Sequence, residues 1–379
     1  TMLNVNWSGN YGHSHYDNAS IILFANGAEL LSDIGYTHSK YRGWTLHTAS
    51  HNTVVIDQKA QDQGTVAKPV TGRLMYYDDQ NPQVKVIDLD ASPAYSTSNE
   101  YRRRLIFVHA AEGMDYVIDR FDVAGGETHD WFLHGMCEEE GKLETSISMD
   151  RPVKTLVPEW GGTAVPMNQY DSDMIGKKIH AYSYMKDIKA GTASKPWTAT
   201  WSYQNSGLRT HHIPQKDTEI FSFRAPSVRL AAEDDNKLDN FMRLGIMQRH
   251  TGNKSSFVAI HEPFQSKPWI KSVRADGDSY LIDYEFNGKN IQDRISLNGN
   301  EISLISSAGW KYAKGREKSG ILKGTEHSGG KHNLELDSAP PDVTHIRLDF
   351  PDGSSLYFPA RNVSGNVIQL DNDPGFSMD

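Results

Sequence analysis

Short apolar or alternating segments, separated by clusters of Gly, Asn, Asp and Pro, recur along almost the whole chain. Successive side chains of a strand point to opposite faces, so segments of this kind predict β-strands. No stretch longer than about ten residues keeps a convincing 3.6-residue apolar period. We therefore expect an all-β protein built mainly as a large antiparallel β-sandwich. The clearest expected strands are 19–25, 72–77, 84–89, 103–109, 116–123, 131–135, 198–203, 219–225 and 256–262.

Two glycine-containing pairs predict tight hairpins. Asn26-Gly27 lies between the strand-like segments 21–25 and 29–31. Both central residues of a type I′ turn need positive φ, which Asn and Gly tolerate best. Gly125-Gly126, between the strand-like segments before and after it, predicts a second hairpin for the same reason.

The apolar pattern resets after residue 264, and a new series of alternating segments begins at Trp269. We expect residues 1–268 to form the large β-sandwich and residues 269–379 to form a smaller C-terminal β-sheet region. The pattern stays β on both sides of this boundary.

Composition excludes several classes of protein. The net charge is −9, with 39 basic and 48 acidic residues, so a nucleic-acid partner is not expected. Cys137 is the single cysteine, which rules out an intramolecular disulfide. The sequence contains no uninterrupted run of 18 apolar residues, so no membrane-spanning helix is predicted. The N-terminus has no signal-peptide pattern and opens almost directly into a polar motif, so we expect the C-terminal part of a longer protein.

Three polar segments within the first sixty residues, each beside strand-like sequence, carry the candidate site. His13 and His15 point the same way if the first segment is extended. Asp33 ends one strand-like segment, and His51 precedes another. Each histidine alone would be an ordinary polar residue with a hydrogen-bond partner, but together they predict a divalent metal site. We expect His15, Asp33 and His51 to bind Zn²⁺, because imidazole and carboxylate suit zinc and no thiolate cluster competes.

The same motifs resemble those of the heparinase II/III-like polysaccharide lyases. The resemblance covers roughly residues 5–275. The motifs that carry it are Gly12-His13-Ser14-His15-Tyr16-Asp17, Leu31-Ser32-Asp33-Ile34-Gly35, Ser50-His51-Asn52-Thr53-Val54-Val55-Ile56-Asp57, the segment 103–109, Tyr116-Val117-Ile118-Asp119-Arg120-Phe121-Asp122-Val123 and His129-Asp130-Trp131-Phe132-Leu133-His134.

The resemblance implies that this chain is the C-terminal β-sandwich of such an enzyme, without the N-terminal α/α toroid that carries the catalytic tyrosine. It places His13 at the position of the catalytic histidine. His15, Asp33 and His51 fall at the positions of the zinc ligands, in agreement with the assignment from the residues. It also implies a periplasmic or secreted protein whose partner is an anionic polysaccharide or oligosaccharide. Asp17 is a candidate to orient a ligand histidine.

Tyr36, Arg42 and Trp44 lie between Asp33 and His51 in the sequence. An arginine can pair with a carboxylate or sulfate, and aromatic rings can stack on sugars, so we expect these residues to contact substrate. Ordinary loop packing is the alternative. His134 is a further candidate, although a hydrogen-bonded core histidine is the more common role for a histidine in such a strand.

These residues suit a lyase that removes the C5 proton of a uronic acid and expels the O4 leaving group, with His13 as base or charge neutraliser. A uronate C5 epimerase shares the proton-abstraction step and is one alternative. A non-catalytic carbohydrate-binding or structural β-sandwich is another.

We expect two further polar clusters to lie at the surface. Arg102-Arg103-Arg104 is interpreted as a solvated strand edge that opposes aggregation. His211-His212 has no partner pattern and is interpreted as part of a surface loop.

Overall fold

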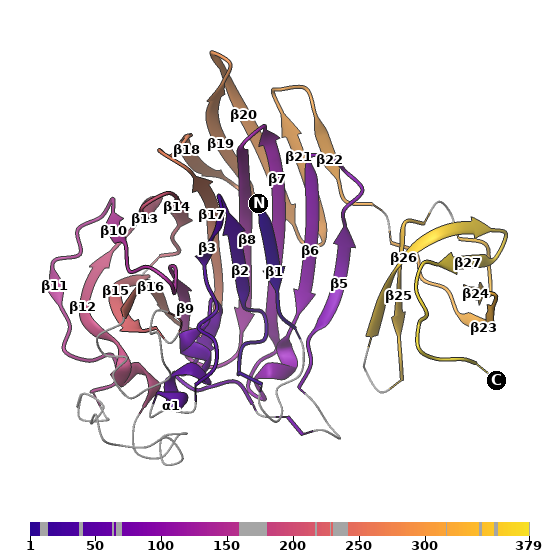
Figure 1. Ribbon diagram of the computed structural model, residues 1–379, viewed down its shortest axis with the longest axis horizontal. Helices are drawn as coiled ribbons and strands as arrows, with labels where there is room; N and C mark the ends of the chain where they lie inside the picture. The colour runs from indigo at the N-terminus through magenta and orange to yellow at the C-terminus, as the bar shows by residue number, and fades with distance from the viewer. Residues whose placement is uncertain are drawn as a thin grey trace.

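The computed structural model describes antiparallel β-structure in five sheets (Figure 1). The described residues are 1–7, 14–37, 41–62, 64–65, 70–158, 180–216, 218–227, 229, 242–315, 317–340, 343–351 and 355–378. Within them the helical segments are the short α1 (Arg42–Thr45), η1 (Thr48–Ser50), η2 (Ser92–Ala94) and η5 (Ala181–Tyr184). None of the helices in those ranges is long and apolar enough to cross a membrane. The prediction of an all-β fold with a large antiparallel sandwich is confirmed.

The largest sheet has eight strands in the order β10-β13-β14-β17-β8-β7-β6-β5. Its long central strands keep a regular register, with Ile118 of β8 opposite Ile106 of β7 and Ile260 of β17. The bounds are β5 (Arg73–Asp78), β6 (Val84–Asp90), β7 (Glu100–Ala111), β8 (Met114–Ala124), β10 (Lys142–Thr145), β13 (Trp197–Ser202), β14 (Gly207–Ile213) and β17 (Lys254–Phe264).

Two smaller sheets pack on one face of this sheet. The six-stranded sheet runs β11-β12-β15-β16-β9-β4, and the three-stranded sheet runs β1-β2-β3. Their bounds are β1 (Met2–Val5), β2 (Ile21–Ala25), β3 (Ala28–Leu31), β4 (Val54–Ile56), β9 (Thr128–His134), β11 (Arg151–Pro152), β12 (Lys186–Thr192), β15 (Glu219–Pro226) and β16 (Met242–Thr251). Leu23, Trp131 and Ile246 from these sheets share one apolar cluster with Leu105 and Phe121 of the eight-stranded sheet.

The opposite face of the eight-stranded sheet is covered by a five-stranded sheet in the order β18-β19-β20-β21-β22. Its bounds are β18 (Ile270–Asp276), β19 (Ser279–Phe286), β20 (Lys289–Asn298), β21 (Glu301–Ser306) and β22 (Lys311–Ala313). Ile106 and Ile118 point into the cluster that these two sheets share, whereas Leu105 and Phe121 point the other way. The eight-stranded sheet is therefore the middle layer of three, and burial on both faces explains its nearly continuous apolar runs.

The division of the chain at residue 268 stays a prediction. Val258 and Ile260 before this position, and Ile270, Ile282 and Ile295 after it, contribute to a single apolar cluster.

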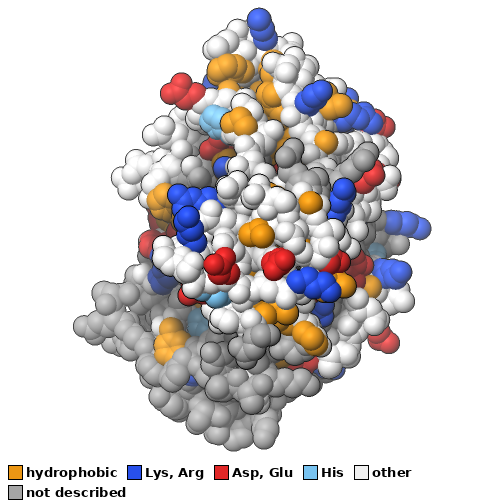
Figure 2. Space-filling model, turned by 90° about the vertical axis from the view of Figure 1, so that its right-hand side faces the viewer, with side chains coloured by type: hydrophobic (Ala, Val, Ile, Leu, Met, Phe, Trp, Pro, Cys, Tyr) orange, Lys and Arg blue, Asp and Glu red, His pale blue; other side chains and the backbone are white. Residues whose placement is uncertain are grey.

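The last sheet lies to one side of the layered body (yellow in Figure 1). Its order is β23-β24-β27-β26-β25, with β23 (Leu322–Ser328), β24 (Lys331–Leu336), β25 (His345–Asp349), β26 (Ser355–Ser364) and β27 (Val367–Leu370). We call residues 322–378 the C-terminal unit. Among its described residues, the buried side chains of its own core are those of Leu334, Leu348, Ile368 and Leu370. The Tyr357 hydroxyl joins it to β5 by accepting from Tyr77 N, at 2.9 Å, and donating to Tyr77 O, at 3.0 Å. In Figure 2, which faces this unit, basic and acidic side chains are interspersed.

One of the two predicted hairpins is confirmed. Asn26 and Gly27 have φ angles of 54° and 83° and join β2 to β3, with Ala25 opposite Ala28. Gly125 and Gly126 also have positive φ, but they join β8 and β9, which belong to different sheets, so the second hairpin prediction is wrong.

The physical reason is a tight crossing between two layers. A Cβ atom on Gly125 would clash with the carbonyl oxygen of Thr97, and one on Gly126 would clash with the side chain of Ile56. The glycines therefore permit close backbone approach rather than a two-residue turn.

Both predicted surface clusters lie largely inside the protein, with only Arg102 partly exposed, so those predictions are wrong. β7 lies between β6 and β8 and is no edge, and Arg103 has no exposed surface. Its guanidinium forms a bidentate ion pair with Asp119, at 2.9 and 2.5 Å. His212 lies within β14 and stacks on Trp197, with ring centroids 4.3 Å apart. His211 contacts the buried Glu262 at 2.9 Å. Sequence patterning missed these partners because they come from other strands.

Candidate metal centre

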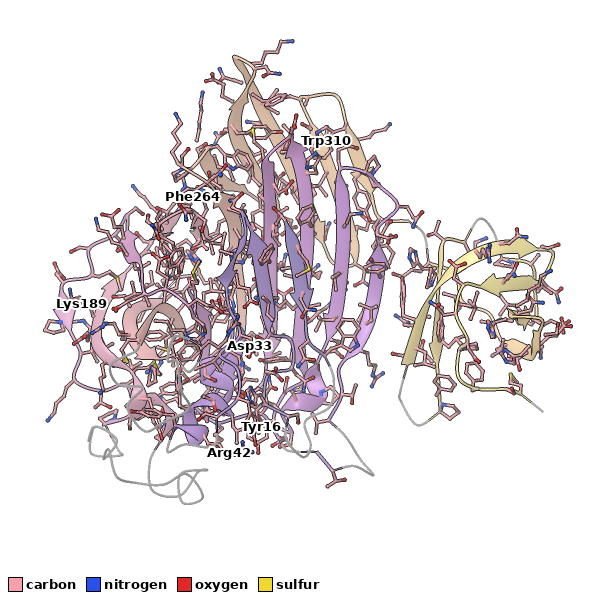
Figure 3. All side chains as sticks on the ribbon, viewed as in Figure 1. Tyr16, Asp33, Arg42, Lys189, Phe264 and Trp310 are labelled. Atoms are coloured by element: carbon pink, nitrogen blue, oxygen red, sulfur yellow. The ribbon has the colours of Figure 1, made fainter. Side chains whose placement is uncertain are left out.

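Three connections at one end of the sandwich bring the predicted metal ligands together. His15 precedes β2, Asp33 follows β3, and His51 follows η1. The β2–β3 hairpin returns the chain, so that its two ends lie on the same side. Figure 3 shows Tyr16, Asp33 and Arg42 toward this end of the large sheets. His15, Asp33 and His51 each offer one ligand atom, and these atoms all lie within 4.8 Å of one another.

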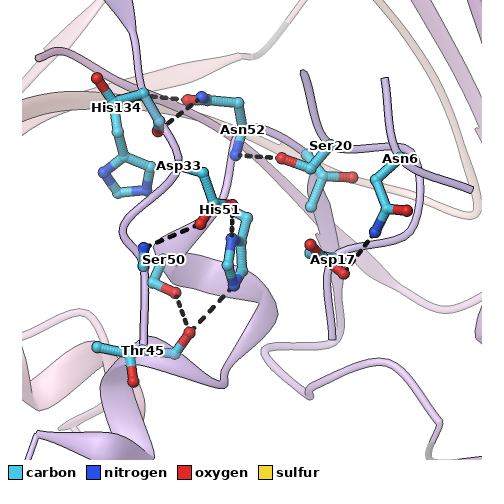
Figure 4. Close-up of polar contacts among 12 residues, drawn as sticks. Asn6, Asp17, Ser20, Asp33, Thr45, Ser50, His51, Asn52 and His134 are labelled. Carbon is cyan, nitrogen blue, oxygen red and sulfur yellow. Dashed lines mark hydrogen bonds and ion pairs between the residues drawn. The ribbon is translucent and has the colours of Figure 1, made fainter. Parts of the chain in front are cut away.

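The donor atoms are already oriented toward one another. His51 Nδ1 lies 2.9 Å from Asp33 Oδ2, and His51 Nε2 lies 3.1 Å from the carbonyl oxygen of Thr45 (Figure 4). Asp33 Oδ1 accepts a hydrogen bond of 2.9 Å from Gly35 N, which leaves Oδ2 to face His51. The rings of His15 and His51 are 5.1 Å apart.

This arrangement fits a bound cation. A carbonyl oxygen can only accept, so the hydrogen of His51 is on Nε2, facing Thr45. The Nδ1 lone pair then faces the Asp33 carboxylate, and two acceptors 2.9 Å apart need a positive species between them. Either a second proton or a metal ion meets this need. Two imidazoles and a carboxylate form a donor set that zinc accepts, with a fourth position left open.

The pKa values of the three ligand side chains shift in different ways. Burial and the neighbouring His51 lower the pKa of His15 to about 4, so His15 stays neutral with a lone pair available. Burial opposes ionisation of Asp33, but His51 and the hydrogen bonds from His51 and Gly35 outweigh it and hold the Asp33 pKa well below its usual range. Burial likewise opposes charge on His51, yet Asp33 dominates and raises the His51 pKa. The centre therefore favours a carboxylate beside a cationic species.

A buried arginine that sequence reasoning missed fixes two of the ligand segments. Arg243 of β16 has no exposed surface, and its guanidinium donates to the carbonyl oxygens of Ser32, at 3.2 Å, and Ser50. These residues directly precede Asp33 and His51. The arginine is 211 residues from Ser32 and 193 from Ser50 in the sequence, and an isolated Arg in a strand gives no signal of such a role.

Asn52 and Arg103 hold the same segments from the other side. The Asn52 amide donates to Ile21 O, at 2.9 Å, and Ser32 O, at 3.2 Å. Asn52 also accepts from the backbone N–H of His134, at 2.7 Å (Figure 4). Arg103 donates to the carbonyl oxygen of Asn52, at 2.5 Å. The Asn beside His51 was visible in the sequence, but its partners were not.

The structure separates the predicted substrate residues into two pairs. The Arg42 guanidinium lies 4.4 Å from the ring centroid of Tyr36, which stacks near His15 with centroids 6.0 Å apart. Trp44 and His134 are fully buried. Trp44 Nε1 donates to Pro226 O at 3.1 Å, and His134 Nε2 lies 2.8 Å from Ala49 O. Neither buried ring presents a surface to a sugar in this structure.

Two further predicted residues remain as predictions. His13, the candidate catalytic residue, lies outside the described residues. Asp17 accepts a hydrogen bond of 2.8 Å from Asn6 (Figure 4), and its charge contributes to the raised pKa of His51. That electrostatic coupling is consistent with a role in supporting the ligand.

The fold and the centre define a layered antiparallel β-sandwich with a candidate metal-binding triad at one end. A model of the family described as heparinase II/III-like, C-terminal, matches residues 5–244, a span that holds the whole triad and Arg243. The chain belongs to this family, as its motifs predicted. No match was found among curated protein sequences.

A solved structure shares the fold. Heparan sulfate lyase HepC from Pedobacter heparinus aligns with a TM-score of 0.50 at 13% identity, over 76% of this chain and 38% of that one. A heparinase III gene product aligns with a TM-score of 0.49 at 13% identity, over 78% of this chain and 39% of that one. The chain therefore spans less than half the length of either protein.

Proposed function

We propose that this chain is the C-terminal part of a polysaccharide lyase that cleaves a uronic-acid-containing polysaccharide by β-elimination. The observation that carries the proposal is the convergence of His15, Asp33 and His51 within the family-matched span. Since the chain covers only 38% of the heparan sulfate lyase, we infer that an N-terminal α/α toroid supplies the remaining catalytic groups.

In this proposal Zn²⁺ is held by His15, Asp33 and His51, where it supplies positive charge and fixes the ligand segments. His13, two residues from His15, acts as base or charge neutraliser. Abstraction of the C5 proton requires a nearby donor or cation to neutralise the substrate carboxylate. Arg42, whose guanidinium already lies beside Tyr36, is suited to pair with a carboxylate or sulfate, and Tyr36 to contact a sugar ring.

The catalytic assignment is tested in the protein that includes its N-terminal region. His13→Ala is expected to abolish formation of the unsaturated uronate, followed by near-ultraviolet absorbance, while the metal content stays unchanged. His109→Ala is the matched control, because His109 is exposed and pairs with Asp115 on a distant hairpin. Full turnover by His13→Ala would refute the assignment. Solvent hydrogen exchange at C5 without chain cleavage would identify a uronate epimerase instead. The absence of both cleavage and exchange would indicate a binding module.

The metal assignment has its own test. His15→Ala is expected to lower zinc content, measured by elemental analysis, together with thermal stability, because one of three protein ligands is lost. Unchanged zinc content would refute this ligand set. The periplasmic or secreted location stays a prediction, which cell fractionation would check.

A further inference from the structure

A second group of metal-type side chains lies in the C-terminal unit, far along the chain from the first centre. His327 of β23 and His332 of β24 are direct cross-strand partners, separated by a turn at Gly329 and Gly330. Both glycines have positive φ, 56° and 74°, which a type I′ hairpin requires. Cross-strand partners have Cβ atoms about 4.5–5.5 Å apart, so the hairpin itself brings the two imidazoles together. Their Nδ1 atoms are 3.0 Å apart.

The third member comes from the end of the chain. Asp373 Oδ1 lies 3.9 Å from His332 Nδ1, and all three ligand atoms of the group lie within 4.8 Å of one another. The segment that carries Asp373 is fastened to the sheet. Met378 N donates to Thr325 Oγ1 of β23 at 2.8 Å, and the ring of Phe376 packs edge-on against Phe350, with centroids 5.5 Å apart.

The hydrogen bonds of His327 determine which of its ring nitrogens carries a lone pair. His327 Nε2 lies 2.9 Å from the carbonyl oxygen of Phe376, which can only accept, so His327 carries its hydrogen there. Nδ1 of neutral His327 is then an acceptor directed at His332 Nδ1. A backbone carbonyl on one imidazole nitrogen, with the other nitrogen free for an ion, is the usual arrangement of a ligand histidine.

We propose that His327, His332 and Asp373 form a second metal site, which takes a divalent transition ion of the zinc class. Two nitrogens bound to one tetrahedral zinc ion lie about 3.3 Å apart, since each Zn–N bond is about 2.0–2.1 Å long. The observed separation of 3.0 Å is close to this value, and ion binding would turn the two Nδ1 lone pairs from each other toward the ion. Two imidazoles disfavour Ca²⁺ and Mg²⁺, which prefer oxygen ligands. Water completes the coordination, because the Asp373 side chain is 67% exposed.

Binding of a metal ion requires His332 to change its tautomer. Without metal, the hydrogen between the two Nδ1 atoms belongs to His332, because His327 Nδ1 is the acceptor. On binding, neutral His332 moves this hydrogen through solvent to its Nε2, and its Nδ1 lone pair coordinates the ion. The carboxylate of Asp373 offsets part of the ion's charge, and no net proton is released from the neutral site.

The small core of the C-terminal unit gives the site a structural purpose. A core of few buried side chains supplies little stability, and proteins with such cores commonly add a metal. The described residues of the unit contribute four buried aliphatic side chains, of which Leu348 is 8% exposed. An ion at this site would join its first hairpin to the end of the chain and close the sheet.

The test counts ions on the complete chain. After chelation and dialysis against Zn²⁺, elemental analysis is expected to show one fewer zinc ion per chain in the double variant His327→Gln, His332→Gln than in the unaltered chain. His109→Gln is the matched control, since His109 is exposed and lies 2.7 Å from Asp115. An equal zinc count in the double variant, or the same loss in the control, would overturn the proposal.

Two further measurements distinguish the loss of a metal ligand from the loss of folding in the C-terminal unit. Asp373→Asn leaves the hairpin intact and is expected to weaken Co²⁺ binding, followed by visible absorbance, at least about tenfold. Co²⁺ is also expected to slow proteolysis after residue 370 in the unaltered chain but not in the double variant. Unchanged Co²⁺ affinity in Asp373→Asn, or equal proteolysis with and without Co²⁺, would overturn the site. The first centre is the same in the unaltered chain and in these variants, so the differences between them report the C-terminal group, and the ion of the first centre responds to His15→Ala.

Discussion

The two His-His-Asp groups share one pattern of histidine hydrogen bonds but differ in burial. In each, one histidine places Nε2 on a backbone carbonyl, Thr45 O for His51 and Phe376 O for His327, and directs Nδ1 toward the other members. His51 is fully buried at one end of the sandwich, whereas the two histidines of the C-terminal group lie on an exposed hairpin.

The difference is in what holds the ligands. The first centre joins three connections whose carbonyls are fixed by the buried Arg243, Arg103 and Asn52. The C-terminal group depends on one hairpin and one docked chain end. A first centre set by long-range contacts should fail when a distant residue changes, whereas a local centre should fail only when its own turn or tail changes.

Replacing Arg243 should give the largest effect. Arg243→Met leaves carbonyl oxygens of Ser32 and Ser50 without this donor, and we expect a loss of about 3 kcal/mol of unfolding free energy, since each unmet buried group costs about 1–3 kcal/mol. Metal affinity at the first centre should fall about 10–100-fold. Urea denaturation and zinc titration measure the two effects.

Arg294→Met is the matched control, because Arg294 forms an exposed ion pair with Asp276 and should lose no more than about 1 kcal/mol. Equal losses in the two variants would contradict the role of Arg243 in holding the ligand segments.

Metal addition should separate the two groups next. All eight tryptophans precede residue 311, so tryptophan fluorescence follows the layered body and not the C-terminal unit. Free zinc at about one hundred times its dissociation constant should stabilise the body by about 2.7 kcal/mol. His51→Gln should remove this gain and His332→Gln should preserve it. A loss in both variants would show that the two groups are coupled.

Acid is expected to destabilise the layered body, which contains His47. Burial and the neighbouring His180 lower the pKa of His47 to about 3, whereas the unfolded chain titrates near 6.5. The unfolded state therefore binds more protons between these values, and stability falls as the pH drops below about 6.5. For one such group the slope is about 1.4 kcal/mol per pH unit.

His47→Asn is expected to reduce that slope in chelator-treated protein, because an amide oxygen can still accept from Ala49 N without titrating. Tryptophan-detected denaturation at a series of pH values measures it. An unchanged slope in the variant would assign the acid sensitivity to other groups.

The smallest expected effect concerns the turns. Gly330→Ala and Gly27→Ala each force an alanine into positive φ, 74° and 83°, where a Cβ meets nothing within 4 Å. Each should therefore cost only about 1 kcal/mol of conformational energy. Gly27→Ala should shift the tryptophan-detected transition, and Gly330→Ala should weaken Co²⁺ binding at the C-terminal group alone. The opposite assignment would contradict the separation of the two units.

Part of the fold and of the first centre was predictable because its signals are local. Period-2 patterning predicted the strands, and Asn26-Gly27 predicted a turn whose φ values only such residues adopt readily. Gly125-Gly126 gave the same local signal with a different result, since positive φ serves a layer crossing as well as a hairpin. The C-terminal histidines escaped notice because their third member, Asp373, lies more than forty residues further along the sequence.

By itself, the sequence determined the all-β class, the family and the three side chains that meet at the first centre, because backbone periodicity and donor chemistry are properties of nearby residues. Only the tertiary structure decided that Arg103 and His212 are interior, that Arg243 holds the ligand segments, and that Trp44 and His134 are buried. Those outcomes depend on which strands become neighbours, and sheet pairing joins residues whose separation along the chain leaves no mark on the local pattern.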